Sequence, residues 1–243
     1  MNKRICIVGG SSGLGSVVSQ KLIEGGGVEI VYVSRNVSSD PRLEEATHIS
    51  LDLATCSALE VNNFLICQGP FDAFCFCQRY RSSDISVESA FIEEYRVTVY
   101  SILLIIDSYF KIYTPTTQLS AVVVGSTYAS CVGFDQPPGY HCAKAAQKSL
   151  VKSLSNLYRA LMSINMFSPP TFIKEGADLY WAKSSKTSLW ETFPGARLPS
   201  VDAIADAIIL SLLNPNQFCS GNDIILDSGF SHVYFDQVSY RRS

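Results

Sequence analysis

The chain has 243 residues, of which 47% are hydrophobic and 17% are charged, and its formal net charge is −3. A chain of this size and composition builds a sizeable core, and its negative charge excludes the basic field that attracts nucleic acid or acidic membranes. No apolar run reaches the roughly 18–20 residues that span a bilayer, and the opening MNKRICIVGG has too short an apolar part for a signal peptide. We therefore expect a soluble cytoplasmic protein without a nucleic-acid or membrane partner.

The cysteines are scattered along the chain, and none forms the paired CxxC pattern that is typical of zinc sites. Because the chain has only three histidines, we expect no metal site. Cysteine packs as a small hydrophobe, so buried, reduced thiols in a reducing compartment are the interpretation that we favour. The eight cysteines are Cys6, Cys56, Cys67, Cys75, Cys77, Cys131, Cys142 and Cys219.

Short apolar runs and helical spacings alternate along the first part of the chain. RICIV at 4–8 and VEIVYV at 28–33 predict buried parallel strands, and residues 16–24 between them have helical spacing. THISLDL at 47–53 predicts a third strand, and SALEVNNFLI at 57–66 predicts the helix that follows it.

The same alternation continues to the C-terminal part. The further predicted elements are a strand at 71–77, a long helix at about 87–112, an apolar strand at 119–125, a helix from about 140 to 162, a strand at 163–167, a helix at 201–213 and a strand at 222–227. Strands that alternate with helices predict an α/β fold with a doubly wound parallel sheet of Rossmann type. We expect one domain over residues 1–243, with a single long break at about 168–200.

The first predicted strand leads into VGGSSGLG, a glycine-rich turn at the start of a helix. Such a turn exposes backbone N–H groups and aims a helix N-terminus at a pyrophosphate, and serine hydroxyls supply further donors. At the end of the first strand of an alternating chain, this predicts a dinucleotide site rather than a merely structural turn. The expected binding residues are Gly9, Ser11, Ser12, Gly13, Leu14 and Gly15.

The second strand ends in Ser34 and Arg35. At this place an NAD-binding protein has an acidic residue that accepts hydrogen bonds from the ribose hydroxyls. A guanidinium suits a 2′-phosphate, so NADP(H) is preferred over NAD(H), against the alternative of a solvated loop arginine. After the third strand, Asp52 and Leu53 stand where a carboxylate holds the adenine amino group, or where Asp52 caps the next helix.

Tyr140 and Lys144 in GYHCAK are four residues apart, so a helix places both side chains on one face. A phenol with a pKa near 10 is a poor base at neutral pH, and an adjacent ammonium favours the phenolate. The alternative is an ordinary surface pair. The glycine turn and Ser126, which follows the apolar strand, favour a catalytic pair instead.

These motifs together resemble the short-chain dehydrogenase/reductase family. The resemblance covers roughly residues 3–229 and implies a Rossmann-type fold, a nicotinamide cofactor and a homodimer or homotetramer built through the helices at about 87–112 and 140–160. It also implies that Ser126 orients the substrate oxygen, that Tyr140 transfers the proton, and that Lys144 lowers the pKa of Tyr140 and binds the nicotinamide ribose.

The sequence departs from the family at four places. Val8 replaces the threonine of the glycine turn, and Phe76-Cys77-Gln78-Arg79 replaces Asn-Asn-Ala-Gly, which brings Gln78 to the cofactor ribose. Thr98 stands where the family has its active-site asparagine and is assigned to the catalytic set. Pro169-Pro170 replaces Pro-Gly.

Two segments bear on the substrate. QRYR at 78–81 brings Arg79 and Arg81 to the end of the fourth strand, which faces the ligand crevice of an open sheet. One hypothesis from this placement is an anionic substrate, such as an acidic sugar, a nucleotide-linked sugar or an acyl-phosphopantetheine carrier. The alternative, an ordinary solvated basic loop, is slightly favoured by the sequence alone. By the resemblance, residues 168–200 form a substrate lid, and its Phe172 is assigned to the cofactor site.

We therefore predict an NADP(H)-dependent oxidoreductase that interconverts a carbonyl and an alcohol on a small anionic substrate. Because Thr98 and Gln78 depart from the family, the alternative is a catalytically impaired dinucleotide-binding protein with a regulatory or assembly role. A dehydratase or epimerase that uses the same tyrosine is a third interpretation. The substrate itself is not determined by the fold.

Overall fold

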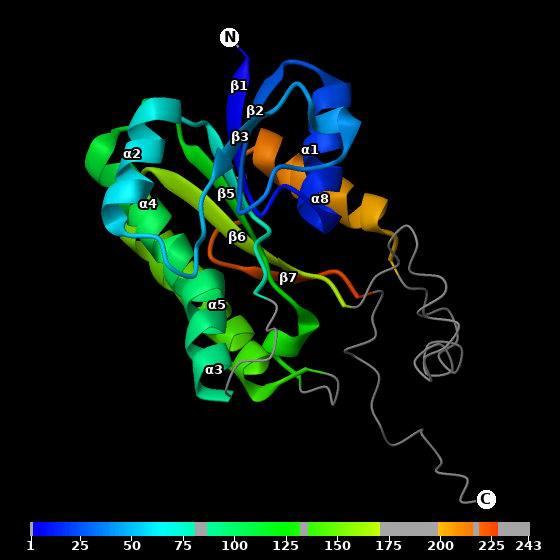
Figure 1. Cartoon of the computed structure of the whole chain (residues 1–243), viewed down its shortest axis with the longest axis vertical. Helices are drawn as coiled ribbons and strands as arrows, with labels where there is room; N and C mark the ends of the chain where they lie inside the picture. Colours follow the sequence, from blue (N-terminus) through cyan, green and yellow to red (C-terminus); the bar gives the residue numbers. More distant parts are fainter. Residues whose placement is uncertain (1, 81–86, 132–135, 171–198, 216–218, 228–243) are drawn as a thin grey trace, which may run out of the picture.

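The computed structural model arranges the apolar runs in one parallel sheet of seven strands, ordered β3-β2-β1-β4-β5-β6-β7 (Figure 1). It describes residues 2–80, 87–131, 136–170, 199–215 and 219–227. The predicted α/β fold with a parallel sheet is therefore confirmed. The strands are β1 (Lys3–Val8), β2 (Val28–Ser34), β3 (Thr47–Ser50), β4 (Ala73–Phe76), β5 (Leu119–Val124), β6 (Met162–Ser168) and β7 (Asp223–Ile225).

Helices cover both faces of the sheet, as Figure 1 shows. Helices α1 (Gly13–Gly25) and α8 (Val201–Leu213) pack on one face. The other face carries α2 (Ala58–Gln68), α4 (Ser101–Ile112) and α5 (Pro138–Leu157). Helix α3 (Val87–Tyr95) packs against α5 and leads into α4.

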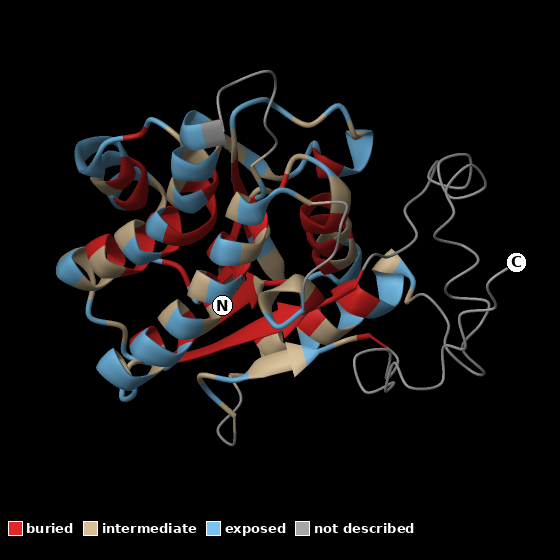
Figure 2. Ribbon diagram, turned by 90° about the horizontal axis from the view of Figure 1, so that it is seen from below, coloured by how far each residue is buried: buried red, intermediate tan, exposed pale blue. Residues whose placement is uncertain are grey.

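Each central strand is buried on both sides because alternate residues point to opposite faces. Along β1, Cys6 and Val8 belong to the core under α2, α4 and α5, whereas Ile5 and Ile7 belong to the core under α1 and α8. Figure 2 shows these strands as a buried layer between helices whose outer faces are exposed. This double burial explains why the strands are continuous apolar runs rather than alternating patterns.

The structure differs from the sequence prediction at several element ends. The predicted helix at 87–112 contains a π-helical turn, η2 (Arg96–Tyr100), between α3 and α4. Helix α5 ends at Leu157 rather than at 162, because Met162 already begins β6. Helix α2 begins one residue later than predicted, at Ala58, because Ser57 is its N-cap and forms a capping box with Glu60.

The expectation of buried thiols is wrong for Cys67, Cys131 and Cys142, which are exposed. Among the described residues, no group of three or more His, Cys, Asp or Glu side chains is placed to hold a metal ion. In the same part of the chain, none of the helices has the length and apolar character needed to cross a bilayer. Residues 171–198 of the expected lid, Phe172 included, lie outside the described residues, so the lid stays a prediction.

The strand order reverses beside β1, which has β2 on one side and β4 on the other. The chain crosses to one face of the sheet after β1 and to the other after β4. In open sheets of this kind, the loops diverge at the reversal and leave a crevice at the carboxyl ends of the strands.

Candidate active site

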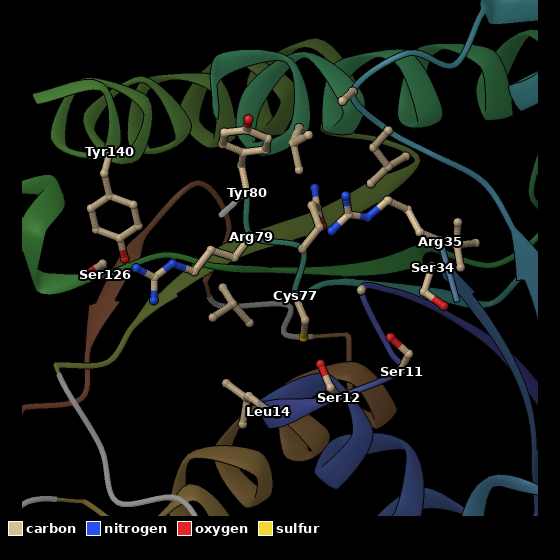
Figure 3. A pocket seen from close by; sticks show the side chains of 18 of the residues that line it. Ser11, Ser12, Leu14, Ser34, Arg35, Cys77, Arg79, Tyr80, Ser126 and Tyr140 are labelled. Carbon is tan, nitrogen blue, oxygen red and sulfur yellow. The ribbon is translucent and has the colours of Figure 1, made fainter. Parts of the chain in front are cut away.

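A cleft of about 960 Å³ lies at these carboxyl ends (Figure 3). Residues that directly follow six different strands line it, namely Gly9, Arg35, Leu51, Cys77, Gly125 and Pro169. The cleft therefore brings together segments that are far apart in the sequence. Its further lining includes Ser126, Tyr140 and Lys144, so the glycine turn and these three of the four predicted catalytic residues share one site.

The glycine turn has the close packing that its sequence predicts. Gly9 has φ +84° and Gly13 has φ +63°, a backbone conformation that other residues rarely adopt. At Gly15, an added Cβ atom would lie 2.3 Å from the carbonyl oxygen of Gly9. Gly15 does not line the cleft, so its role is to let the first turn of α1 pack under the loop.

Ser11, Ser12, Gly13 and Leu14 line the cleft at the start of α1, and Figure 3 shows the Ser11 and Ser12 side chains at its edge. The N-cap residue Ser12 makes no side-chain capping bond. The first N–H groups of a helix have no partner within the helix and favour an anion. This turn therefore fits the pyrophosphate of a dinucleotide.

Arg35, after β2, forms no ion pair with the residues that the structure describes, and Figure 3 shows its side chain extending into the cleft. Ser34 also lines the cleft, but its hydroxyl already donates to the carbonyl of Asn36, at 2.6 Å. Among the described residues that line this part of the cleft, Arg35 therefore offers a cation that is not neutralised by an ion pair.

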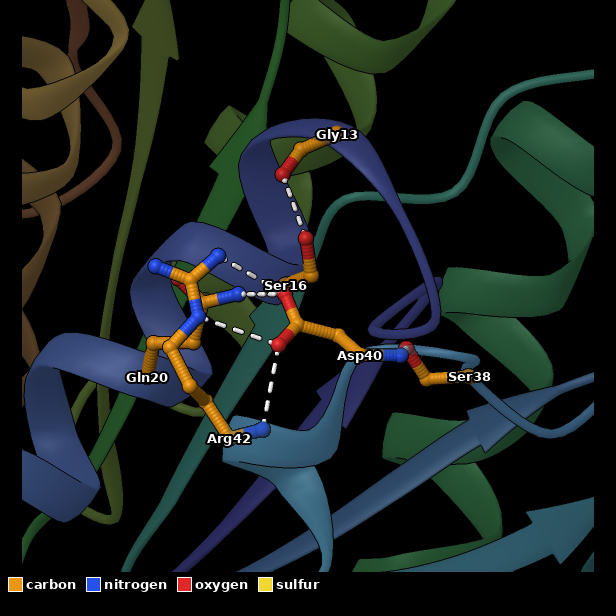
Figure 4. A network of polar contacts seen from close by, with 6 residues as sticks. All are labelled: Gly13, Ser16, Gln20, Ser38, Asp40 and Arg42. Atoms are coloured by element: carbon orange, nitrogen blue, oxygen red, sulfur yellow. Dashed lines mark hydrogen bonds and ion pairs between the residues drawn. The ribbon is translucent and has the colours of Figure 1, made fainter. Parts of the chain in front are cut away.

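Hydrogen bonds connect the segment after β2 to α1, as Figure 4 shows. Asp40 accepts hydrogen bonds from the backbone N and the Nε of Arg42, both at 3.0 Å, and the Gln20 amide also donates to it. The Arg42 side chain lowers the pKa of Asp40, so the network keeps its charge pair at neutral pH. It links the segment that follows Arg35 to the middle of α1.

Asp52 and Leu53 line the cleft, as predicted. Asp52 Oδ1 accepts from the backbone N of Ala54 at 3.0 Å and so stabilises the turn after β3. The alternative that Asp52 caps the next helix is wrong, because Ser57 is the N-cap of α2.

Gln78 is 6% exposed and lines the cleft beside the glycine turn. Its Nε2 donates to Ser101 Oγ at 3.1 Å, whereas its Oε1 has no hydrogen-bond partner among the described residues. A buried carbonyl oxygen without a partner is costly, so a ligand that donates a hydrogen bond to it binds favourably. This fits the expected contact with a ribose hydroxyl.

The predicted catalytic serine and tyrosine lie on different elements. Ser126 follows β5 and caps the short 3-10 helix η3 (Thr127–Ala129), where its Oγ accepts from Tyr128 N at 3.2 Å. Tyr140 is in the first turn of α5, which two prolines begin. Figure 3 shows the Tyr140 hydroxyl directed toward Ser126, so a substrate oxygen between them contacts both.

Lys144 is one turn further along α5 and is 3% exposed. Its Nζ donates to the carbonyl of Val124 at 3.0 Å and lies 5.7 Å from the centre of the Tyr140 ring. Burial lowers the pKa of Lys144 from 10.5 to about 8, while nearby Glu94 opposes this effect and Arg79 adds to it. Below about pH 8 the ammonium is therefore present beside Tyr140.

Thr98 does not line the cleft. It lies buried in η2, where its Oγ1 donates to Glu94 Oε1 at 2.6 Å. Thr98 therefore does not contact the cleft directly, and its place in the catalytic set stays a prediction. Glu94, which the sequence prediction missed, is 5% exposed and electrostatically coupled to Lys144. The available signal was a glutamate one helical turn before Thr98.

Arg79 lies over the ring of Tyr140, with its guanidinium carbon 4.9 Å from the ring centre. Its Nη2 donates to Gln136 Oε1 at 2.7 Å, and it makes no ion pair with a carboxylate of the described residues. Figure 3 shows the guanidinium beside the hydroxyl groups of Ser126 and Tyr140. Arg81 lies outside the described residues.

No family model matches the chain. A sorbose reductase of Schizosaccharomyces pombe is 30% identical over 91 residues, which span 37% of this chain and 35% of that protein. The matched segment is thus well under two thirds of the length of this curated relative.

Many solved structures share the fold. A short-chain dehydrogenase family protein of Francisella tularensis superposes with a TM-score of 0.77 at 21% identity, over 96% of this chain and 100% of that one. A short-chain dehydrogenase of Leptospira borgpetersenii with bound NAD+ gives 0.80 at 17% identity, over 95% and 93%. RhlG of Pseudomonas aeruginosa, in complex with NADP, gives 0.74 at 18% identity, over 94% and 96%.

The chain has the Rossmann-type fold of the short-chain dehydrogenases, over nearly its whole length. The fold that the resemblance implies is therefore confirmed by these structural neighbours.

Proposed function

We propose that the protein is a short-chain dehydrogenase/reductase that interconverts a carbonyl and an alcohol with NADP(H). The observation that carries this proposal is the shared cleft, which Ser126, Tyr140 and Lys144 line together with the glycine turn. A site that holds a dinucleotide next to a phenol and a buried ammonium is suited to moving a hydride and a proton together.

When bound, the nicotinamide supplies or accepts the hydride. During carbonyl reduction, Tyr140 donates its phenolic proton to the substrate oxygen, which the Ser126 hydroxyl orients by a hydrogen bond. The Lys144 ammonium stabilises the phenolate that remains, because an opposite charge nearby favours the ionised form of a phenol. During alcohol oxidation the same groups act in the opposite order.

The test combines cofactor binding with a panel of carbonyl substrates. We expect NADPH fluorescence to report binding to both the wild-type protein and a Tyr140→Phe variant, whereas turnover falls by about 10²- to 10⁴-fold in the variant. Tyr158→Phe, at the end of the same helix, is the matched control and keeps full turnover. Binding without oxidation of NADPH on any substrate favours the dinucleotide-binding protein without turnover, and absence of binding contradicts both functions.

The preference for NADP(H) rests on Arg35, which has no carboxylate partner among the described residues. A guanidinium binds a 2′-phosphate by paired hydrogen bonds, so Arg35→Ala is expected to weaken NADPH binding by about tenfold or more and to leave NADH binding within about twofold. Equal losses for the two dinucleotides contradict the preference. Structural neighbours occur with either NAD+ or NADP, so they do not decide it.

The substrate that we propose carries an anionic group close to its reacting carbonyl. Arg79 supports this, because its guanidinium lies over Tyr140 and makes no ion pair with the described carboxylates. A carboxylate or phosphate near the carbonyl meets this cation while the carbonyl oxygen meets Tyr140.

Arg79→Ala is expected to raise the KM of an acidic substrate at least tenfold, while the KM of its neutral ester changes little. Arg159→Ala, an exposed arginine after α5, is the control that alters neither value. If Arg79→Ala raises the KM of the acid and of the ester equally, Arg79 does not recognise the charge of the substrate. If the variant instead binds NADPH more weakly, the anion that Arg79 contacts belongs to the cofactor.

A homodimer or homotetramer is part of the proposal. Exposed apolar side chains on α3, η2 and α4 support it, because such a surface favours burial against a partner. They are Phe91, Ile92, Tyr95, Tyr100 and Leu103. Light scattering of the purified protein tests it, and a monomer at micromolar concentration contradicts it.

Residence in the cytoplasm also stays a prediction, which localisation of a tagged protein checks.

A further inference from the structure

Two cations approach the ring of Tyr140 from different elements. Lys144, one turn further along α5, has its Nζ 5.7 Å from the ring centre. Arg79, in the loop after β4, has its guanidinium carbon 4.9 Å from the same point and is thus no farther away. In the proposed mechanism Lys144 acts on the tyrosine, whereas Arg79 has no part in the proton transfer.

The guanidinium of Arg79 is held at the start of α5. Its Nη2 donates to Gln136 Oε1 at 2.7 Å, and Gln136 directly precedes the two prolines that begin the helix. Figure 3 shows the guanidinium beside the hydroxyl groups of Ser126 and Tyr140. Because Gln136 and Tyr140 flank the start of α5, the hydrogen bond and the ring contact together place the cation at the tyrosine.

Position 79 is also a place where the chain departs from the family that it resembles. Phe76-Cys77-Gln78-Arg79 stands in place of Asn-Asn-Ala-Gly, so the resemblance gives this position a glycine, which has no side chain. The arginine therefore adds a cation that the motif of the family does not supply.

The surroundings of Tyr140 allow this cation to act on it. Tyr140 is 8% exposed, so water screens a charge near its ring poorly, although Arg79 itself is exposed and its field is weakened on that side. The field reaches Lys144, whose pKa is about 8: burial lowers this pKa most, Glu94 raises it, and Arg79 lowers it. A phenolate spreads negative charge into its ring, so a guanidinium over the ring favours the phenolate more than the neutral phenol.

Other titratable groups surround Tyr140 and its two cations. They are Tyr128 of η3, His141 and Lys144 of α5, Glu94 of α3 and Cys77 after β4. Glu94 is the acid of this set and offsets part of the field of both cations. Lys144 loses its proton above about pH 8, whereas a guanidinium is not deprotonated in proteins. Arg79 therefore remains a cation at Tyr140 after Lys144 has become neutral.

We propose that Arg79 is a second cation of the catalytic tyrosine, which stabilises the Tyr140 phenolate from the face of its ring. This inference rests on the proposed function and adds to the contact of Arg79 with an anionic substrate. During alcohol oxidation the Tyr140 phenolate accepts the proton of the substrate hydroxyl, while Arg79 keeps its own protons and transfers nothing. In this role Arg79 acts through Tyr140 and is a positioning residue.

The first test follows the ionisation of Tyr140 without turnover. Carbon-13 at the tyrosine Cζ position makes the titration visible by NMR, and Tyr140→Phe assigns the signal. Arg79→Gln removes the charge, whereas Arg79→Lys keeps it. We expect the midpoint of the Tyr140 titration to lie about 0.5–1 pH unit higher in Arg79→Gln than in the wild type, and to stay near the wild-type value in Arg79→Lys.

The matched control for this titration is Arg159→Gln. Arg159 is an exposed arginine after α5, and its replacement leaves the midpoint unchanged. An unchanged midpoint in Arg79→Gln overturns the proposal. If the wild type turns over no substrate but the midpoint moves in Arg79→Gln, the proposed function fails while the action of Arg79 on Tyr140 stands.

The second test separates this role from substrate binding. With an uncharged alcohol as substrate, the acid limb of the pH profile of kcat follows the formation of the phenolate. We expect Arg79→Gln to move this limb up by about 0.5–1 pH unit and to lower kcat below the limb about three- to tenfold, while KM changes little. An effect confined to the KM of acidic substrates, with the kcat profile unmoved, leaves Arg79 as a substrate contact alone and contradicts the proposal.

Discussion

Replacing Lys144 by methionine is expected to stabilise the fold while it removes the proposed activity. Lys144 is 3% exposed, and burial lowers its pKa from 10.5 to about 8. At about 1.4 kcal/mol per pKa unit, keeping the ammonium in the folded core costs about 3 kcal/mol. Methionine avoids this cost but loses the hydrogen bond to Val124, which contributes about 1–2 kcal/mol. The net expectation at pH 7 is a gain of about 1–2 kcal/mol, or several degrees in Tm.

The pH dependence of this gain identifies its cause. Below about pH 8 the lysine is protonated in both the folded and the unfolded state, so the wild type carries the full cost. Between about pH 8 and 10.5 the unfolded state binds more protons than the folded state, and the stability of the wild type rises with pH. The advantage of Lys144→Met is therefore expected to shrink steadily over this range.

Urea unfolding followed by circular dichroism at several pH values measures both effects. Lys152→Met, on the exposed side of the same helix, is the matched control and should show no such pH-dependent gain. A Lys144→Met protein that is less stable than the wild type at pH 7 refutes the reasoning. A stability difference that stays constant from pH 7 to pH 10 refutes it equally, because burial of the charge is then not the cause.

Three further predictions concern the glycine turn, a helix cap and the pH profile. Gly15→Ala brings a Cβ atom to 2.3 Å from the Gly9 carbonyl oxygen, so we expect a loss of about 1–3 kcal/mol in unfolding free energy and weaker NADPH binding in fluorescence titration. Ser57→Ala removes the side chain that caps α2 and pairs with Glu60, which is expected to cost about 1 kcal/mol in urea unfolding. Reductase activity measured against pH should fall as pH rises through about 8, because the Lys144 ammonium is lost there.

Each of these has a clear contrary outcome. Gly25→Ala is the control for the glycine turn, since no atom lies within 4 Å of its added Cβ, and equal effects of the two substitutions disprove the packing argument. An unchanged unfolding free energy in Ser57→Ala shows that the capping box contributes nothing. If reductase activity falls only well above pH 9, the ionisation of Lys144 is not the cause of the fall.

Much of this architecture follows from short-range patterns. A strand buried on both sides needs an unbroken apolar run, and RICIV and LSAVVV supply it in β1 and β5. The turn at Gly9 and Gly13 needs positive φ angles, which glycine adopts without strain. Because such demands are local, the alternating elements, their fold class and the glycine turn were predictable. The proximity of Tyr140 and Lys144 was also predictable, because residues four apart lie on one face of a helix.

Contacts between distant segments were decided only in the tertiary structure. The sequence does not reveal that Arg79, after β4, lies over Tyr140, or that Glu94 is buried near Lys144. It also does not show the π-helical turn that directs Thr98 to Glu94. Burial and charge coupling depend on which elements pack together, and this packing is set by the whole sheet rather than by neighbouring residues. The electrostatics around the proposed catalytic residues are therefore a property of the fold.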